Sequence, residues 1–246
     1  MAKKTKPAGL KVKVIGCGGI GTCLIDTLCR YLNYSDFQNI EVSLIDGDTY
    51  EERNRERQVF RSIGPKASIT AERLREEFPR LIFWDHPVYL ADHNIISLLR
   101  ENDYVFSCVD NHKTRKLVSD RAEELDDVTV ISGGNDYEDG NIQIHIRRGG
   151  ENITVPVASN YHPEIQNPAD RNPGDIDEER EGCQEQQAAS PQLLIMNNLI
   201  AAHMLGKFYG VQKGYHEKDP KEFSEFYVDI PTGKVVPRTR FLPKNK

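Results

Sequence analysis

The chain contains 246 residues, of which 38% are hydrophobic and 28% charged, and its formal net charge is −6 at pH 7. These values suit one large soluble domain, and the acidic balance argues against a nucleic-acid partner because nucleic-acid binders usually present a basic face. No apolar run reaches the roughly 18 residues that a membrane span needs, and the N-terminus lacks the apolar core of a signal peptide. We therefore expect a cytoplasmic protein with no membrane partner.

The first half of the chain alternates strand and helix patterns. Residues 10–16 and 40–46 predict two strands, and between them apolar residues recur at a helical spacing, namely Ile20, Leu24, Leu28 and Leu32. Such a βαβ unit has a right-handed crossover. The pattern then predicts helices over residues 65–79, 94–102 and 114–125, and strands within 81–90 and over 103–110 and 128–135. This order predicts a Rossmann-like, doubly wound α/β fold with a mainly parallel sheet.

The second half of the chain has a different composition and a different order of predicted elements. Residues 141–149 alternate with period two, which predicts an antiparallel strand with one solvated face. Residues 151–189 are polar, acidic and rich in proline, and they predict a long crossover loop. A strong helix is expected from Ser190 to Gly210, followed by a hairpin around residues 231–234. We predict that residues 1–246 form a single domain, in which residues 1–9 are a flexible basic arm.

Four glycines occur at the junction of the first strand and the first helix. In the segment GCGGIG, Gly16, Gly18 and Gly21 fit the pattern G-x-G-x-x-G, and Gly19 lies between them. The first glycine permits a tight turn, the second lets the backbone approach a phosphate, and the third lets helix pack on strand. Asp46 ends the second strand, where an acidic side chain can hold a ribose. The segment therefore predicts a nucleotide site, and by itself it leaves NAD and ATP open.

Three further features favour a triphosphate over a dinucleotide. The segment DGDTYEERNRERQ follows the second strand and contains Arg57, which can bind phosphate oxygens with two donors at once. Lys66 opens the next helix, where it can reach a β- or γ-phosphate. Asp110 follows the fourth strand, at the edge of the sheet where ligands bind, and a carboxylate there suits Mg²⁺. Each residue also has a structural alternative: Asp110 as a helix cap, Arg57 in a surface ion pair, Lys66 as a solvated helix residue.

The motifs in this order resemble the ThiF/MoeB/HesA family of adenylyltransferases, which shares its fold with the ubiquitin-activating enzymes. The family pattern is a glycine loop, then D-x-D…N-x-x-R-Q, then a lysine, then a C-x-D-N…R segment. This chain has GCGGIG, LIDGDTYEERNRERQ, GPK and SCVDNHKTR in the same order. The resemblance implies binding of Mg-ATP and of the C-terminal tail of a ubiquitin-like or sulfur-carrier protein. The tail carboxylate then attacks the α-phosphorus, an acyl-adenylate forms, and pyrophosphate leaves.

The resemblance also implies roles for individual residues. The aspartate matching Asp46 binds the ribose hydroxyls, Asp48 belongs to the same D-x-D motif of the nucleotide site, and the aspartate matching Asp110 helps to hold Mg²⁺. The residues that contact the phosphates match Asn54, Arg57, Gln58 and Lys66. We expect no side-chain nucleophile in the adenylation step, because such transfers depend on positioning and charge stabilisation.

The chain departs from the family pattern at several points. The segment between Arg57 and Lys66 is shorter than expected, which would displace Lys66, and Gly47 occupies a place that often has a larger residue. The family usually forms a homodimer in which an arginine from the partner's N-terminal region enters the site. The N-terminal arm here offers Lys3, Lys4 and Lys6 but no arginine, and Arg53 or Arg55 are the candidate substitutes. The paired CxxC motif of many members is absent, so we expect a zinc-free subgroup.

The five cysteines predict neither a disulfide framework nor a structural zinc site, since their number is odd and no pair has CxxC spacing. Four of them are expected to be buried thiols: Cys17, Cys23, Cys29 and Cys108. Cys183 lies in the acidic loop before the helix that starts near Ser190. In some family members a cysteine in this region forms a thioester or accepts sulfur, and the alternative is an exposed spectator. The acidic side chains around Cys183 would raise its pKa.

The seven histidines match no metal-site spacing, and we expect them at the surface. Taken together, the sequence predicts an ATP-dependent adenylyltransferase that acts on a protein C-terminus. Two alternatives belong to other classes. One is an NAD(P)-dependent oxidoreductase, and the other is a catalytically silent dimerisation or scaffold module.

Overall fold

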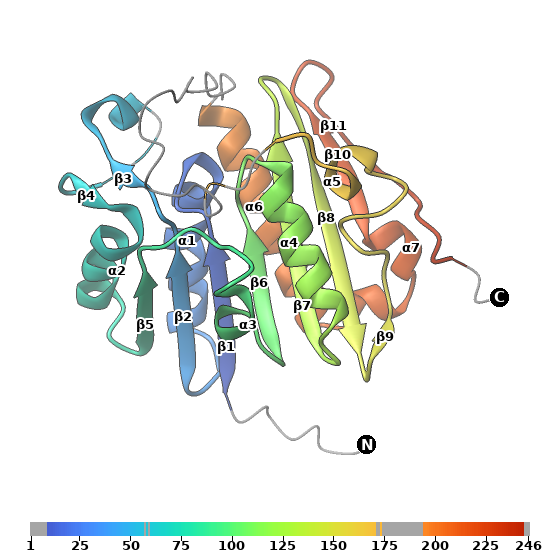
Figure 1. Ribbon diagram of the computed structural model, residues 1–246, viewed down its shortest axis with the longest axis horizontal. Coiled ribbons are helices and arrows are strands. Elements are labelled where there is room, and N and C mark those ends of the chain that lie inside the picture. Colours follow the sequence, from blue (N-terminus) through green and yellow to red (C-terminus); the bar gives the residue numbers. More distant parts are fainter. Residues whose placement is uncertain (1–8, 57, 59, 171–172, 174–193, 244–246) are drawn as a thin grey trace.

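A computed structural model describes residues 9–56, 58, 60–170, 173 and 194–243 (Figure 1). Its centre is a nine-stranded sheet, in which five strands run parallel. In spatial order these are β5 (Leu81–His86), β2 (Ile40–Ile45), β1 (Leu10–Ile15), β6 (Asp103–Ser107) and β7 (Val128–Asn135). Next to β7 the sheet continues antiparallel through β8 (Asp139–Arg148), β10 (Glu225–Asp229) and β11 (Lys234–Pro237), and β9 (Glu151–Asn152) pairs with β8.

Helices cover both faces of the sheet, as a doubly wound fold requires. One face packs against α1 (Gly19–Asn33), α2 (Lys66–Glu77) and α6 (Leu194–Gln212). The other packs against α3 (Ile95–Leu98), α4 (His112–Glu123) and α5 (Pro163–Gln166). The shorter elements are β3 (Thr49–Tyr50), β4 (Gly64–Pro65), α7 (Pro220–Phe223) and the 3₁₀ helices Glu52–Glu56 and Tyr215–Glu217. The predicted fold class and the antiparallel strands of the second half are confirmed.

Helix α1 forms where the apolar spacing predicted it. Its four periodic residues lie in the core with at most 4% of their surface exposed, and these are Ile20, Leu24, Leu28 and Leu32. Burial of each such side chain stabilises the fold by roughly 1.5–3 kcal/mol. Together they fix the helix on β1 and β2, and so fix the direction in which the N-terminus of α1 points.

Strand β8 differs from the prediction of one solvated face. Residues 142–146 are buried without interruption. Ile142, Ile144 and Ile146 pack in the same core cluster as α6, while on the opposite face His145 is covered and hydrogen-bonds Asn152. The prediction was wrong because the segment after β8 folds back over the sheet instead of leaving it to solvent.

The segment predicted as one long loop, residues 151–189, contains regular structure in its described part. Strand β9 pairs with β8, and α5 packs against α4. Helix α6 is described from Leu194, so the proposed cap at Ser190 lies outside the described residues, and the helix continues two residues beyond Gly210. The hairpin around residues 231–234 is confirmed, since β10 and β11 pair antiparallel.

Three histidines are buried, contrary to the expectation of surface positions. His145 has none of its surface exposed, His162 has 4% and His216 has 7%. Both ring nitrogens of His162 have hydrogen-bond partners, whereas His145 has one partner, Asn152 at Nε2, and its Nδ1 has none among the described residues. The sequence pattern around a histidine does not show which distant residues will lie next to its ring in the fold.

Strand order creates a switch point between β1 and β6. From β1 the chain moves outward to β2 and β5, and it then returns to β6 on the opposite side of β1. In open α/β sheets, ligands bind in the crevice at the carboxyl ends of the strands at such a point. The glycine segment follows β1 and residues 108–110 follow β6, so both lie at this edge of the sheet (Figure 1).

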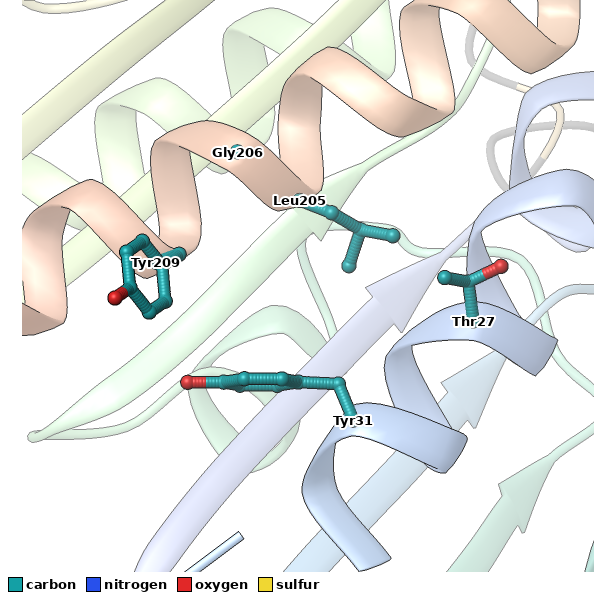
Figure 2. Close-up of a pocket in the computed structure, with 5 residues that line it drawn as sticks. All are labelled: Thr27, Tyr31, Leu205, Gly206 and Tyr209. Carbon is teal, nitrogen blue, oxygen red and sulfur yellow. The ribbon is translucent and has the colours of Figure 1, made fainter. Parts of the chain in front are cut away.

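A shallow groove of about 270 Å³ lies elsewhere, between α1 and α6 (Figure 2). Its lining residues are Thr27, Tyr31, Leu205, Gly206 and Tyr209. Thr27 and Tyr31 belong to the second half of α1, away from the glycine segment, and the lining carries no charged side chain. It therefore lacks the chemistry that a nucleotide needs. Within the part of the chain that the structure describes, no helix is long and apolar enough to span a bilayer.

Candidate functional site

The glycine segment makes a turn that only glycines can form. Gly16 has a φ of +90°, and a Cβ there would lie 2.9 Å from the carbonyl oxygen of Cys108. A Cβ on Gly21 would lie 2.0 Å from the carbonyl oxygen of Gly16. Both distances are far below ordinary contact, so these two glycines let α1, β1 and the end of β6 meet.

Gly18 has a different environment. A Cβ at Gly18 would meet open space, and its nearest neighbour, Nε2 of Gln58, would be 4.0 Å away. Gly18 is the N-cap of α1, no side chain of the described residues caps this helix, and its first turn has no acidic residue. The first amides of α1 therefore face a bare opening in a field that favours an anion.

Asp46 binds the glycine segment directly. Its Oδ2 accepts a hydrogen bond of 2.5 Å from the amide of Cys17, and its Oδ1 accepts one of 2.8 Å from the amide of Asp48. Burial raises the pKa of Asp46, although the charge of Lys66 opposes the shift. Each carboxylate oxygen keeps a further lone pair, which is what a ribose hydroxyl needs.

Lys66 lies next to this carboxylate in spite of the short segment before it. Strands β3 and β4 pair, which brings the start of α2 back to Asp48. The amide of Lys66 donates to the carbonyl of Asp48 at 2.8 Å, and its Nζ lies 2.8 Å from Asp48 Oδ2. Burial alone would raise the pKa of Asp48, but the charge of the Lys66 ammonium group and the hydrogen bond from it outweigh burial and lower that pKa. Lys66 is itself 7% exposed, so its charge is held at the site rather than in solvent.

Tyr89 is a site residue that the sequence did not indicate. Its hydroxyl donates to Oδ1 of Asp48, and its ring lies against Gly47, where a Cβ would be 2.5 Å from the ring. The missing side chain at Gly47 therefore has a physical reason, because the tyrosine occupies that space. Tyr89 follows β5 by three residues, and no motif connects it with Asp48 in the sequence.

Two residues of the N-x-x-R-Q motif are described, and both are buried. Oδ1 of Asn54 accepts the amide hydrogen of Glu51 at 2.8 Å, and the carbonyl of Asn54 accepts from the amide of Gln58 at 2.9 Å. Asn54 thus shapes the turn, while Oε1 of Gln58 is buried with no partner among the described residues. Arg57 lies outside the described residues. Arg53 forms an ion pair of 2.6 Å with Glu51, and both side chains are exposed.

Asp110 is exposed at the end of β6 and is not the cap of the next helix. Asn111 is the N-cap of α4 and accepts from the amide of Thr114 at 2.8 Å. The next amides of α4, those of His112 and Lys113, donate to the two carboxylate oxygens of Asp170 at 2.6 and 3.0 Å. Because these two side chains cap the helix, the carboxylate of Asp110 is left for a ligand.

Arg115 fixes the main chain next to Asp110. Its Nη2 donates to the carbonyls of Val109 and Gly133 at 2.7 and 2.8 Å, and its Nη1 donates to Oγ of Ser132 at 3.3 Å. The guanidinium thus links the carboxyl ends of β6 and β7. Burial lowers the pKa of Arg115, and the charge of Asp110 opposes this shift.

We expect Arg115→Lys to lower the free energy of unfolding by about 2–3 kcal/mol, because an ammonium group cannot bridge two strands and would leave buried carbonyls unpaired. Urea unfolding measures the change. Arg121→Lys on the same helix is the control, since Arg121 contacts Leu99 and the exposed Glu124 and should cost less than about 1 kcal/mol. Equal losses in the two variants would contradict the assignment of Arg115.

The cysteines at the site are inert. Cys17 and Cys108 are buried, and burial raises the pKa of both, to about 12 for Cys108. Cys29 is buried as predicted, whereas Cys23 is only half-buried, because its side of α1 faces the surface. Cys183 lies outside the described residues, and its role stays a prediction.

Comparison with known proteins places this chain in a family. The ThiF family model matches residues 3–240. The adenylyltransferase and sulfurtransferase UBA4 of Vanderwaltozyma polyspora is 32% identical over 139 residues, which cover 54% of this chain and 30% of the relative. The corresponding protein of Ogataea parapolymorpha is 25% identical over 220 residues, covering 88% of this chain and 50% of the relative. The matched region therefore spans between 30% and 50% of the length of these curated relatives.

Solved structures share the fold. The crystal structure of E. coli MccB with AMPCPP and MccA has a TM-score of 0.66 at 18% identity, covering 94% of this chain and 63% of that one. The crystal structure of PaaA has a TM-score of 0.60 at 14% identity, covering 94% of this chain and 64% of that one. With the family model matching nearly the whole sequence and the glycine segment, the D-x-D aspartates and Asp110 gathered at one edge of the sheet, the chain belongs to the ThiF family.

Proposed function

We propose that the chain is an ATP-dependent adenylyltransferase that activates the C-terminal carboxylate of a ubiquitin-like or sulfur-carrier protein. The observation that carries this proposal is the convergence of three groups at the switch point between β1 and β6. These are the uncapped N-terminus of α1, the cluster of Asp46, Asp48 and Lys66, and the free carboxylate of Asp110. The similar proteins support it, since UBA4 is named an adenylyltransferase and sulfurtransferase, and MccB was crystallised with AMPCPP.

The nucleotide would bind along the glycine segment. The amides of Gly19 and Ile20, which directly follow Gly18 and Gly19, would donate to phosphate oxygens, and the carboxylate of Asp46 would accept hydrogen bonds from the ribose hydroxyls. Nζ of Lys66 would exchange its contact with Asp48 for a phosphate oxygen, or contact both. Asn54, Arg57 and Gln58 complete the phosphate contacts in this proposal, and Gln58 brings a donor, Nε2, to the edge of the opening, 4.0 Å from the place of a Cβ on Gly18.

Magnesium is part of the proposal because the donor set suits it. Among the described residues no three His, Cys, Asp or Glu side chains cluster around a common point. Mg²⁺ usually binds through one or two carboxylates together with substrate phosphates. The exposed carboxylate of Asp110 beside a triphosphate would match this coordination preference. When bound, the ion would neutralise charge on the phosphates.

The reaction needs no side-chain nucleophile. An oxygen of the tail carboxylate attacks the α-phosphorus, the bond between the α-phosphorus and the bridging oxygen breaks, and pyrophosphate leaves with that electron pair. Lys66 and the amides of α1 stabilise the charge that develops on the phosphate oxygens. A later transfer to Cys183, with the thiolate attacking the acyl carbon and AMP leaving, stays a prediction, as do the homodimer and the cytoplasmic location.

The test begins with the partner. The protein is incubated with a non-hydrolysable ATP analogue and a lysate, and a captured protein is identified and its C-terminus sequenced. The purified partner should then support exchange of labelled pyrophosphate into ATP, and a version with an amidated C-terminus should not. Exchange without any tail, or retention of NAD(P)H and not ATP by the purified chain, would contradict the proposal. Failure of every candidate tail to support exchange would favour a silent scaffold module.

A further inference from the structure

His162 lies between two carboxylates in the described part of the crossover segment. Its Nδ1 is 2.7 Å from Oε1 of Glu164, and its Nε2 is 2.7 Å from Oε1 of Glu225. Glu225 has none of its surface exposed, and His162 has 4% exposed. The sequence expectation of a surface histidine gave no indication of this arrangement, and no step of the proposed reaction uses it.

Each ring nitrogen of His162 faces a carboxylate oxygen. Burial alone would raise the pKa of Glu225, but the hydrogen bond with His162 and the charge of Arg240 outweigh it and lower that pKa. Burial would also raise the pKa of Glu164, but a backbone hydrogen bond and the hydrogen bond with His162 lower it. The ring therefore bridges two carboxylates that belong to segments distant in sequence.

Arg240 extends the group to the C-terminal segment. Its Nε lies 3.2 Å from Oε2 of Glu225, and its Nη2 donates to the carbonyl of Ser224 at 2.8 Å and to that of Val155 at 3.4 Å. Arg240 is 1% exposed. One buried charge group therefore joins three segments that are distant in sequence, and removal of one member leaves the others unpaired at a cost.

This group lies one short helix away from the candidate site. Helix α5 begins directly after His162 and packs against α4. Asp170, which follows α5 in the chain, caps the first amides of α4. The first of these amides, that of His112, lies two residues after Asp110. Of the neighbouring groups, His112 on α4 interacts with Glu164, and Arg238, which donates a hydrogen bond to Tyr227, interacts with Glu225.

We propose that His162 is a positioning residue: it holds residues 153–170 against the sheet and so keeps Asp170 on the N-terminus of α4, beside Asp110. Its effect on activity rests on the proposed function, whereas its effect on the segment does not. His145 provides a matched contrast. It is equally buried, but its Nε2 contacts Asn152 and its Nδ1 has no hydrogen-bond partner among the described residues, so this ring does not join two segments through carboxylates.

The first measurement uses the unaltered protein labelled with ¹⁵N-histidine. At pH 7 both ring nitrogens of His162 should show a hydrogen bond, while in His145 Nε2 should show one and Nδ1 none. A ring nitrogen of His162 without a hydrogen bond would overturn the proposal. This result needs no variant, and so it stands even where a substitution prevents folding.

The second measurement compares His162→Gln with His145→Gln by hydrogen–deuterium exchange. An amide cannot bridge the two carboxylates in the same way, so protection of residues 153–170 and of the first turn of α4 should fall by about 10- to 100-fold in His162→Gln. His145→Gln should leave these segments within about twofold of the unaltered protein. Unchanged protection in His162→Gln, or equal loss in both variants, would overturn the proposal.

The rate of pyrophosphate exchange is the measurement that a purely structural role of His162 would leave unchanged. With the tail substrate, His162→Gln should lower the rate of pyrophosphate exchange at saturation by at least about tenfold, with ATP affinity unchanged. His162→Lys, which keeps a donor to Glu225, should recover part of that loss. A loss of ATP affinity equal to the loss of rate would contradict positioning through Asp170. If no tail supports exchange but the two measurements above succeed, the proposed function fails and the positioning role remains.

Discussion

Asp110→Asn should lower ATP–pyrophosphate exchange by about 10²–10³-fold, which is the scale of losing one stabilising group in a transition state. The amide keeps the size of the side chain but loses the charge that would face a metal-bound triphosphate. Folding should be unaffected, because Asn111 and Asp170 cap α4 and Asp110 is exposed. Exchange measured at saturating ATP and tail, with thermal unfolding measured in parallel, checks both statements.

Asp120→Asn is the matched control for this substitution. Asp120 lies on the same helix, α4, and within the described part of the chain it forms an exposed ion pair of 2.7 Å with Lys116. Loss of such a pair costs little, so exchange should stay within about twofold. Normal exchange in Asp110→Asn, or equal loss in both variants, would show that the metal assignment is wrong.

Gly21→Ala should unfold or severely destabilise the protein. The new methyl group would lie 2.0 Å from the carbonyl oxygen of Gly16, and backbone cannot move aside as a flexible side chain can. Overpacking in a close-packed core commonly costs about 1–3 kcal/mol, and we expect at least the upper value here. Urea unfolding followed by circular dichroism measures the loss.

Gly18→Ala separates binding from folding. Its methyl group would enter open space at a residue with an ordinary φ of −80°, so the free energy of unfolding should change little. ATP affinity should nevertheless fall about tenfold or more, since the methyl group occupies the approach of phosphate to the amides of α1. Calorimetric titration with ATP measures this. Unimpaired binding by Gly18→Ala would place the nucleotide elsewhere.

The parallel half of the fold was predictable because its patterns are local. Alternation in β1 and β2, and the spacing of Leu24 and Leu28 in α1, each report on burial by the nearest elements. The buried second face of β8 was not predictable, because the segment that covers it comes from residues after 151 and carries no periodic pattern. A period-two signal shows which residues share a face, but it does not show whether something covers the other face.

The candidate site was predictable where its residues belong to sequence motifs. The glycine segment, Asp46 and Asp110 lie at the carboxyl edge of the sheet because parallel strands end there, which is a property of topology. Tyr89 and Asp170 were missed, since each reaches the site from an irregular segment without a motif. The buried ring of His162 was missed for the same reason: its carboxylate partner Glu225 is far along the chain.

Tyr89 and Gly47 have a consequence for sequence variation among relatives. The ring fills the volume that a side chain at position 47 would need, and its hydroxyl is bound to Asp48. A bulky residue at position 47 would displace the ring, and Oδ1 of Asp48 would then lose the hydrogen bond from the Tyr89 hydroxyl. We therefore expect the two positions to covary, with tyrosine at 89 found only beside glycine at 47. An alignment in which they vary independently would refute this coupling.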